Sequence, residues 1–370
     1  MNLTIERSAL LKSLQHVQSV VERRNTIPIL SNVLLSADDG ALGLTATDMD
    51  IAVVDRAACE VRQAGATTAP AHMLYDIVRK LPEGGQIELA TEGESLQVRS
   101  GRSSFTLMCL PTEDFPAMTE GDLSHRFALP AGDLLRLIDK ARFAISTEET
   151  RYYLNGIYLH AVAANGAATL RAVATDGHRL ARVEVDLPDG AEDMPGIIVP
   201  RKAVGEIHKL LEDSAEPVQI ALSETKIRFD VDGTVLTSKL IDGTFPDYAR
   251  VIPENNDKVM DVDGKDFAAA VDRVSTISSD KSRAIKLSIA PGKLVLSANS
   301  PEQASATEEL SVQYDFDAID IGFNSRYVLD MTQQIEGDSM RFRMADAASP
   351  TTVSDSNDPR ALYVLMPMRV

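Results

Sequence analysis

Apolar residues recur at helical spacing in six segments of the chain. In the first segment, residues 6–24, one face collects aliphatic side chains and the opposite face collects polar ones. The aliphatic set is Leu10, Leu14, Val17 and Val21, and the polar set is Lys12, Gln15, Ser19 and Arg23. The pattern predicts helices over 6–24, 70–81, 132–143, 200–211, 264–274 and 324–335.

Short alternating runs fill the stretches between these helices. Residues 86–110, QIELATEGESLQVRSGRSSFTLMCL, alternate apolar and polar positions with glycine at the turns, which is typical of antiparallel hairpins. No glycine-rich loop follows a buried strand, so a doubly wound nucleotide-binding fold is not expected. The pattern predicts an α+β protein in which helices lie on antiparallel sheets.

The chain also repeats itself, with a period near one third of its length. ATDGHRLARV at 174–183 has a counterpart in ATDMDIAVV at 46–54, so Asp48 and Asp176 stand 128 residues apart. A weaker third copy, LVLSANSPEQASATEEL, places Asn299 at 123 residues after Asp176. The helical segments PAHMLYDIVRKLPEG, PRKAVGEIHKLLED and NSRYVLDMTQQIEG keep the same stride. We predict three homologous domains, each with two helices on antiparallel sheet, spanning 1–120, 121–253 and 254–370.

The net charge of −18, taken as a whole, argues against a nucleic-acid partner, because phosphate binding needs a basic surface. The charge is unevenly distributed, however. The six predicted helices hold 15 Lys and Arg against 9 Asp and Glu, whereas the rest of the chain holds 22 against 46. Either a solvated helix face collects Lys and Arg because they are good helix formers, or the helices share one surface that faces a polyanion.

Composition is that of an ordinary soluble globular protein, with 44% hydrophobic and 25% charged residues over 370 positions. No run of eighteen apolar residues occurs, and MNLTIERSALL lacks the basic-then-apolar order of a signal peptide. We therefore expect a cytoplasmic protein without a membrane partner. Cys59 and Cys109 lack CxxC spacing and are expected to be buried thiols.

ATDGHRLARV is the most enzyme-like stretch of the chain. Asp176 could orient His178 as a general base, with the hydroxyl of Thr175 nearby. This hydrolase hypothesis lacks a GxSxG or similar elbow and leaves the repeat unexplained, so no catalytic residue is predicted. The histidines show no HxxxH pattern, and Asp48 and Asp50 form only a bare DxD, so no metal and no other cofactor is expected. The basic helices argue against a third hypothesis, a sheet-rich scaffold unrelated to DNA.

Seven motifs occur in an order and spacing that resemble one known family. They are NTIPILSNVLL, SGRSSFTL, RYYLNGIYLH, ATDGHRLA, IVPRKAV, SKLIDGTFPDYARVIP and the terminal YVLMPMRV. Together they resemble the bacterial sliding clamp, the β subunit of DNA polymerase III holoenzyme, from Met1 to Val370. The resemblance implies a head-to-tail homodimer that forms a closed ring of six similar domains, with helices around the hole. It implies a processivity factor, without catalytic activity or cofactor, that threads duplex DNA and tethers a polymerase.

The resemblance also implies a set of residues near DNA. They are Arg24, His72, Arg151, Tyr152, Tyr153, Arg201 and Lys202. Basic side chains in the hole would meet phosphates without reading bases, as sliding requires. The loop before Arg151, TEET, is more acidic than is usual in the family, and His72 stands where a basic residue is common. Alternatively, the two tyrosines pack the start of a strand and Arg24 closes a helix.

A second implied site is a groove between the second and third domains. Family members bind short linear motifs there, including those of the clamp loader, the replicative polymerase and repair proteins. The matching residues are Leu154, Thr175, Gly177, His178, Arg179, Leu180, Pro246, Arg250, Val251, Val364, Leu365, Met366, Pro367, Met368 and Arg369. Leu, Val, Pro and Met make an adaptable apolar groove, and arginines at its rim can orient a peptide backbone.

At the dimer contact we expect the edge strand SGRSSFTL of one copy. Its residues Arg102, Phe105 and Leu107 are expected to meet TISSDKSRAIKL of the other copy, including Ile277. This contact would pair the open sheet edges of the two end domains.

Overall fold

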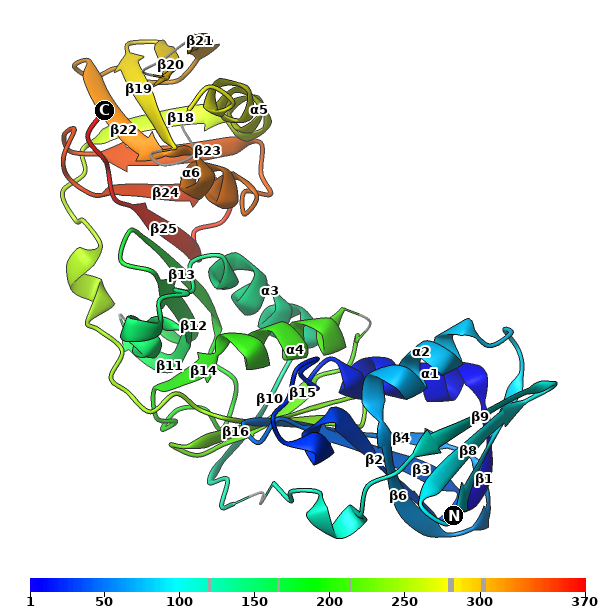
Figure 1. Ribbon diagram of the computed structural model, residues 1–370. Coiled ribbons are helices and arrows are strands. Elements are labelled where there is room, and N and C mark those ends of the chain that lie inside the picture. Colours follow the sequence, from blue (N-terminus) through cyan, green and yellow to red (C-terminus); the bar gives the residue numbers. More distant parts are fainter. Residues whose placement is uncertain (119–120, 165–166, 213, 279–282, 301–303) are drawn as a thin grey trace. The chain divides into compact units, whose positions relative to one another are not determined.

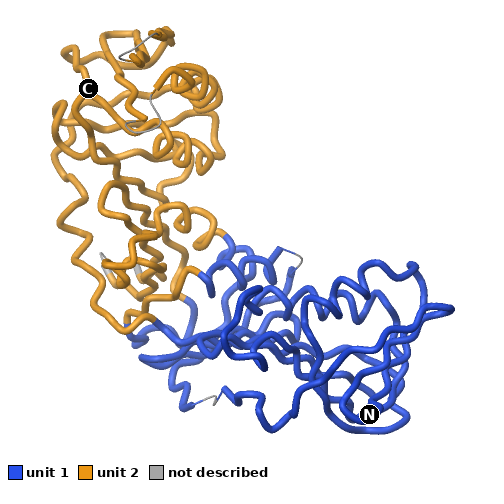
Figure 2. The backbone as a smooth tube through the Cα atoms, viewed as in Figure 1, with its two compact units in different colours: residues 1–135, 188–195, 202–240 blue, residues 136–187, 196–201, 241–370 orange. Residues whose placement is uncertain are grey.

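In a computed structural model, the chain divides into two compact units (Figure 2). One unit comprises residues 1–135, 188–195 and 202–240, and the other comprises 136–187, 196–201 and 241–370. The structure describes residues 1–118, 121–164, 167–212, 214–278, 283–300 and 304–370. The turn of the weakest ATD copy, after Asn299, falls largely on residues 301–303, outside the described residues.

One order of elements occurs three times along the chain (Figure 1): a strand, a helix, three strands, a strand, a second helix and three strands. The first copy, which has the additional strand β5, consists of β1 Asn2–Glu6, α1 Arg7–Gln18, β2 Asn32–Asp38, β3 Ala41–Thr47, β4 Ile51–Ala58, β5 Glu60–Gln63, β6 Gly65–Pro70, α2 Ala71–Lys80, β7 Gln86–Glu92, β8 Ser95–Ser100 and β9 Ser103–Met108. Two short 3-10 helices, η1 Pro28–Ser31 and η2 Thr112–Asp114, also belong to this copy.

The other two copies follow the same order. The second consists of β10 His125–Leu129, α3 Ala131–Arg142, η3 Glu149–Leu154, β11 Gly156–Ala164, β12 Ala167–Thr175, β13 Arg179–Asp186, β14 Ile197–Pro200, α4 Arg201–Leu211, β15 Val218–Leu222, β16 Lys226–Val231, β17 Thr234–Lys239 and η4 Tyr248–Val251. The third consists of β18 Lys258–Asp263, α5 Gly264–Ser275, β19 Ala284–Ala290, β20 Lys293–Ser300, β21 Ala304–Ser311, β22 Ile319–Asn324, α6 Ser325–Thr332, β23 Ser339–Met344, β24 Thr351–Asp355 and β25 Ala361–Leu365. The predictions of an α+β fold and of a threefold repeat are confirmed.

Strand pairing joins consecutive repeats. Each unit contains one eight-stranded antiparallel sheet, of order β10-β15-β16-β17-β4-β3-β2-β6 in one and β14-β11-β12-β13-β25-β24-β23-β18 in the other. The joining pairs are β17 with β4 and β13 with β25. Because the middle repeat gives strands to both sheets, it is divided between the two units. The domain boundaries near 121 and 253 remain a prediction.

The two remaining sheets are smaller and have open edges. Their orders are β5-β1-β7-β8-β9 in the first unit and β21-β20-β19-β22 in the second. Consequently β9 and β21 each pair with one neighbour, β8 and β20 respectively.

The amphipathic pattern gave helix positions to within a few residues. Leu10, Leu14 and Val17 of α1 are fully buried, as their spacing predicts. α1 ends at Gln18 rather than 24, because the chain continues in turns that place Val21 in the core, with 3% exposure. Within their units, α1 packs beside α2 and α5 beside α6 (Figure 1).

Both cysteines are free and half-buried rather than fully buried. Burial raises the pKa of the Cys59 thiol and of the Cys109 thiol, so both resist ionisation. In the described parts of the chain, no helix is both long and apolar enough to cross a membrane.

Candidate functional site

The two ATD copies form the same hydrogen-bonded turn. Asp176 Oδ1 accepts the backbone N–H groups of His178 and Arg179 at 2.9 and 3.0 Å. In the first repeat, Asp48 Oδ1 accepts the backbone N–H groups two and three residues later, at 2.9 and 2.8 Å. The shared aspartate is therefore a turn-forming residue that satisfies backbone donors.

The position after each aspartate needs a left-handed backbone. Gly177 has φ +88° and its counterpart Met49 has φ +78°. A Cβ at Gly177 would also lie 2.5 Å from Arg151 Nη1. Gly177 thus adopts this conformation without strain and lets the guanidinium of Arg151 lie directly on the turn.

The Asp–His pair does not have the geometry of a general base. Asp176 Oδ2 accepts Nε of Arg179 at 3.1 Å, while its other oxygen accepts two backbone amides. The imidazole of His178 instead stacks on Tyr327, with ring centroids 6.2 Å apart. Among the residues that the structure describes, no cluster of acidic, histidine or cysteine side chains could hold a metal ion.

Arg179 holds the turn to two helices. Its Nη1 lies 2.5 Å from Asp330 Oδ2 on α6, and its Nη2 donates to Phe143 O, just after α3, at 2.6 Å. The guanidinium lies over the ring of Tyr327, 4.3 Å from its centroid. Because the side chain is only 9% exposed, it does not have the solvated rim position that we predicted for an arginine orienting a peptide backbone. Its three partners, Asp176, Asp330 and the carbonyl of Phe143, explain the difference.

Replacing Arg179 with Met is expected to lower the stability of this unit by about 3 kcal/mol, because Asp176 and Asp330 would keep their charges without a cationic partner. For a unit of this size the loss corresponds to a melting temperature about 6–12 °C lower in calorimetry. Arg99→Met is the matched control, since Arg99 lies 3.6 Å from Glu92 and both are over half exposed. Equal melting temperatures for the two variants would contradict the buried role of Arg179.

An apolar pocket of about 300 Å³ opens beside this turn. Ten of the predicted groove residues line it: Leu154, Thr175, Gly177, His178, Arg179, Leu180, Pro246, Val251, Val364 and Met366. Its floor is a buried cluster that includes Leu154, Leu180, Tyr248 and Val364. Val251 and Met366 remain 49% and 40% exposed at its mouth. Exposed apolar side chains over a buried apolar floor suit a short peptide with apolar anchors.

Five predicted groove residues do not line this pocket. Leu365 is fully buried in β25, and Arg250 is 84% exposed and pairs with Asp247 at 2.8 Å. Pro367, Met368 and Arg369 belong to the C-terminal tail, where Met368 N donates to Gly322 O at 2.9 Å. These five residues remain predicted partner contacts, outside the pocket itself.

Four lining residues were not predicted for the pocket: Arg151, Tyr153, Asp247 and Tyr248. All four stand within or beside motifs singled out in the sequence, RYYLNG and FPDYARV. Tyr248 is also part of a polar network behind the pocket. Its hydroxyl accepts Arg171 Nη1 at 2.7 Å and lies 3.0 Å from His160 Nε2. Burial, followed by the nearby Arg171 guanidinium, lowers the pKa of His160 to about 4.

Acidification below pH 6.5 is expected to destabilise this unit through His160. The pKa of His160 is lower in the folded chain than the ordinary 6.5, so between these values the unfolded chain binds the extra proton. Stability from this group is complete above pH 6.5 and is lost as the pH falls toward 4, by up to about 1.4 kcal/mol per pH unit. Thermal unfolding at pH 7 and pH 5 measures the loss. His160→Gln should reduce the difference, and a His125→Gln control should not.

The ammonium of Lys202 already binds three oxygens. Its Nζ lies 2.5 Å from Asp48 Oδ2, 2.7 Å from Glu22 Oε1 and 3.1 Å from Val20 O. Burial by itself lowers the pKa of Lys202, but hydrogen bonds to Asp48 and Glu22 outweigh it and raise the pKa. Lys202 thus ties α4 to the first ATD turn and to the end of α1. A phosphate would have to compete with two carboxylates for it.

Arg151 is likewise paired, and its partner comes from the acidic loop. Its Nε and Nη2 bind the two carboxylate oxygens of Glu148 at 2.8 and 2.6 Å. The hydrogen bond from Arg151 lowers the pKa of Glu148. Since Arg151 lines the apolar pocket, its position supports a peptide contact in addition to the predicted DNA contact.

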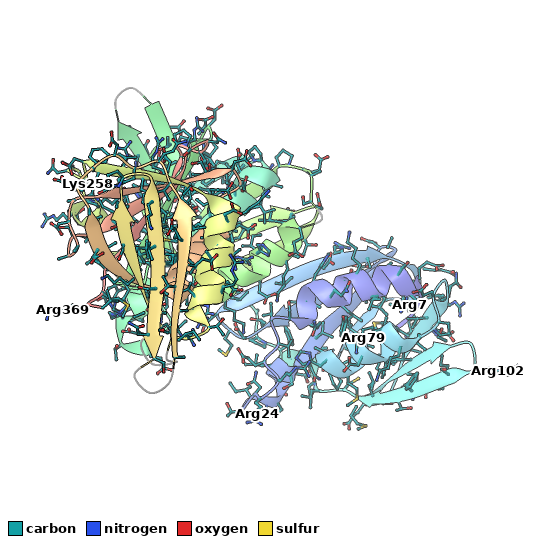
Figure 3. All side chains as sticks on the ribbon, turned by 90° about the horizontal axis from the view of Figure 1, so that it is seen from above. Arg7, Arg24, Arg79, Arg102, Lys258 and Arg369 are labelled. Atoms are coloured by element: carbon teal, nitrogen blue, oxygen red, sulfur yellow. The ribbon has the colours of Figure 1, made fainter. Side chains whose placement is uncertain are left out.

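The other predicted DNA contacts differ in how exposed they are and in whether they already bond within the chain. Arg24, beyond the end of α1, and Arg201 are exposed, and Figure 3 shows Arg24 extending away from the ribbon. Tyr152 is 54% exposed, whereas Tyr153 packs against the buried cluster of the pocket. His72 bonds through both ring nitrogens to the end of α1, with Nδ1 2.8 Å from Gln18 Oε1 and Nε2 2.9 Å from Val21 O. Only the exposed members can reach a ligand without rearrangement.

The predicted dimer contact contains an open strand edge. On β9, Phe105 is 37% and Met108 is 66% exposed, whereas Leu107 is buried. Arg102 stands at the tip of the β8–β9 turn (Figure 3). Ile277, after α5, is half-buried, and residues 279–282 of the predicted partner segment lie outside the described residues.

Comparison with known proteins gives a consistent result over the whole chain. Three family profiles match: DNA polymerase III beta subunit N-terminal domain over residues 1–119, central domain over 128–247 and C-terminal domain over 249–369. The beta sliding clamps of Caulobacter vibrioides and Escherichia coli K12 are 54% and 40% identical, with full coverage of both chains in each case. The solved DnaN sliding clamp of Bartonella birtlesii bound to griselimycin is 52% identical over all of both chains, with a TM-score of 0.98.

Proposed function

This chain belongs to the DNA polymerase III beta subunit family, the bacterial sliding clamps, and from that premise we propose that two copies close head to tail around duplex DNA. The protein is a non-catalytic processivity factor that tethers a polymerase to the DNA it copies. The proposed ring contains six similar domains, three from each copy, with the boundaries predicted above. Its place of action is the cytoplasm, where bacterial chromosomal DNA is replicated.

The repeat-to-repeat junctions carry the ring proposal. Each repeat has two sets of three consecutive strands, one after its first helix and one after its second helix. In both junctions within the chain, the last strand of the first set of one repeat pairs with the last strand of the second set of the next repeat. These pairs are β4 with β17 and β13 with β25. By the same rule, β9 of the first repeat should pair with β21 of a third repeat, and both are open edges. A second copy of the chain supplies that pairing at both ends, which closes the ring.

The side chains at these two edges differ in charge. β9 offers Phe105 and the adjacent turn offers Arg102, while β21 carries Glu308 and Glu309, which form ion pairs with Arg273 and Lys293 of the same chain. β19, which belongs to the partner segment that we predicted, already has β20 and β22 as neighbours. The pairing strand of that domain is therefore β21, and Ile277 is an apolar contact beside it in the proposed interface.

The apolar pocket is the proposed docking site for partner proteins. The clamp loader, the replicative polymerase and repair proteins would each insert the apolar side chains of a short linear motif. Val251 and Met366 at the mouth, over the buried floor, support this use. DNA contact is proposed to be electrostatic and independent of sequence, with exposed Arg24 and Arg201 facing phosphates.

A salt challenge on circular DNA tests the ring. The protein is loaded on a nicked circle by a clamp loader, washed at high salt and then released by linearising the circle. A closed ring should survive the salt and leave the cut ends, whereas an electrostatic binder should be lost in the wash through counterion uptake. Retention on linear DNA with unblocked ends would refute threading, and a linear DNA with blocked ends is the control.

A further inference from the structure

One wall of the apolar pocket is formed by residues 245–251. Four of these residues line the pocket: Pro246, Asp247, Tyr248 and Val251. They belong to the connection between the second and third repeats, in which only the short 3-10 helix η4 is regular. The position of this wall therefore depends on the side-chain contacts that hold the connection against the neighbouring strands.

Aromatic contacts hold the connection to strand β11. The ring of Phe245 lies parallel to the ring of Tyr158, with centroids 4.9 Å apart and planes at 6°. Tyr158 stacks in turn on the imidazole of His160, with centroids 4.5 Å apart. Phe245 is 8% exposed and belongs to the buried cluster that forms the floor of the pocket. Through this stack His160 supports the floor, although it does not itself line the pocket.

Hydrogen bonds from two strands hold the hydroxyl of Tyr248. It accepts a hydrogen bond from Arg171 Nη1 at 2.7 Å and lies 3.0 Å from His160 Nε2. A guanidinium only donates, so the hydroxyl accepts from Arg171 and can give its own proton to Nε2. His160 and Arg171 stand directly opposite each other on β11 and β12, which lie side by side in Figure 1. Both hydrogen bonds of the hydroxyl therefore end on one rigid pair of strands.

This arrangement requires a neutral imidazole, because only a neutral ring can accept a proton at Nε2. Burial, followed by the guanidinium of Arg171, lowers the pKa of His160 to about 4, so the ring is neutral at pH 7. Among the described residues, Arg171 on β12 and Glu184 on β13 are the charged groups that act on it. Glu184 in turn binds Arg171 Nη2 at 2.7 Å and lies 3.4 Å from Arg182 Nε, so Arg171 is itself fixed.

Tyr248 connects this network to the pocket. Its ring packs in the buried cluster with Leu154, Leu180 and Val364, whereas its hydroxyl bonds to Arg171 behind the wall. The side chain is 8% exposed, so a hydroxyl proton left without an acceptor could not turn freely to water. The orientation of the ring thus depends on both the cluster and the network.

We propose that His160 is a positioning residue of the apolar pocket. Together with Arg171 it fixes the ring of Tyr248 and thereby strengthens the binding of a partner motif's apolar side chain. A ring that already occupies one position loses little conformational freedom when the motif binds, whereas immobilising a free side chain costs affinity. This inference rests on the proposed function, which places partner motifs in the pocket.

A double-mutant cycle on peptide affinity tests this role. His160→Leu removes the acceptor for the hydroxyl of Tyr248, so the ring has to be ordered when the peptide binds. Affinity for a labelled clamp-binding peptide of the cognate polymerase, measured by fluorescence polarisation on the full chain, should fall by about three- to tenfold. In a Tyr248→Phe background, which lacks the hydroxyl, the same substitution should change the affinity by less than about twofold.

Two further variants separate positioning from a loss of structure. His160→Gln keeps an acceptor, because its amide oxygen can take the place of Nε2, and its affinity should stay within about twofold of the original chain. His125→Leu makes the matched substitution at a half-buried histidine on β10, in the other unit, and should leave the affinity unchanged. Thermal unfolding of each variant verifies that it is folded at the temperature of the binding measurement.

The opposite results would overturn the inference. An equal loss of affinity for His160→Leu in both backgrounds would show that His160 acts without the hydroxyl of Tyr248. An unchanged affinity for His160→Leu, or an equal loss for His160→Gln, would exclude a role for the hydrogen bond. In these cases the pocket remains the docking site. If instead Val251→Asp binds the peptide as tightly as the original chain, the motif docks elsewhere, and the proposed docking site fails together with this inference.

Discussion

Phe105→Asp is expected to leave the chain monomeric at micromolar concentration, because it places a carboxylate in the strand that closes the proposed ring. Phe105 is 37% exposed on β9, which among the described strands pairs only with β8. Loss of a buried aromatic anchor costs about 2–4 kcal/mol of association, and an unpaired charge at the same place adds to the cost. The dimer dissociation constant should rise by about 100-fold or more.

Sedimentation of the variant measures this directly against the chain mass of 40.1 kDa. Phe316→Asp is the matched control, since Phe316 is 41% exposed but lies in the connection between β21 and β22, outside both strands. The control should stay dimeric and remain on circular DNA in high salt, whereas the Phe105 variant should be lost. A dimer of unchanged mass for Phe105→Asp would remove β9 from the interface.

Local patterns predicted the helices and the turns of this fold well. α2 runs from Ala71 to Lys80 against a predicted 70–81, because its amphipathic spacing depends only on neighbours along the chain. The ATD turns are equally local, because each aspartate binds the amides two and three residues after it. The extra length predicted for α1 was wrong because Val21 keeps the helical spacing but reaches the core from a turn.

Local sequence patterns could not predict contacts between residues that are far apart in the chain. The partners of Arg179, Asp330 and Phe143, stand 151 and 36 residues away in sequence. Lys202 likewise binds Asp48 from a separation of 154 residues. The sequence near Arg179 and Lys202 contains no signal for the distant partners Asp330 and Asp48. From the sequence alone, both side chains are therefore expected to be cations that face the solvent. Ten of the residues implied by the family resemblance line one apolar pocket, but only folding distinguishes the residues on its wall from those behind it.

Val251→Asp is expected to weaken partner binding by about 10- to 100-fold while the ring and its DNA retention stay intact. Val251 lines the mouth of the apolar pocket at 49% exposure, so a carboxylate there remains hydrated and folding is little affected. An apolar anchor of the partner motif would lose its contact and face a charge instead, at a cost of about 1.5–3 kcal/mol. Fluorescence polarisation with a labelled clamp-binding peptide of the cognate polymerase measures the change.

Val54→Asp makes the same substitution at a site that the pocket does not include. Val54 is 37% exposed on β4, in the other unit, and should leave peptide affinity at the wild-type value. Because β4 pairs with β17, this variant also controls for damage to a repeat junction. If Val251→Asp bound the peptide as tightly as Val54→Asp did, partner motifs would have to dock elsewhere. The C-terminal tail from Pro367 to Arg369 would then be the next surface to test, since it directly follows the lining residue Met366 in sequence but does not line the pocket.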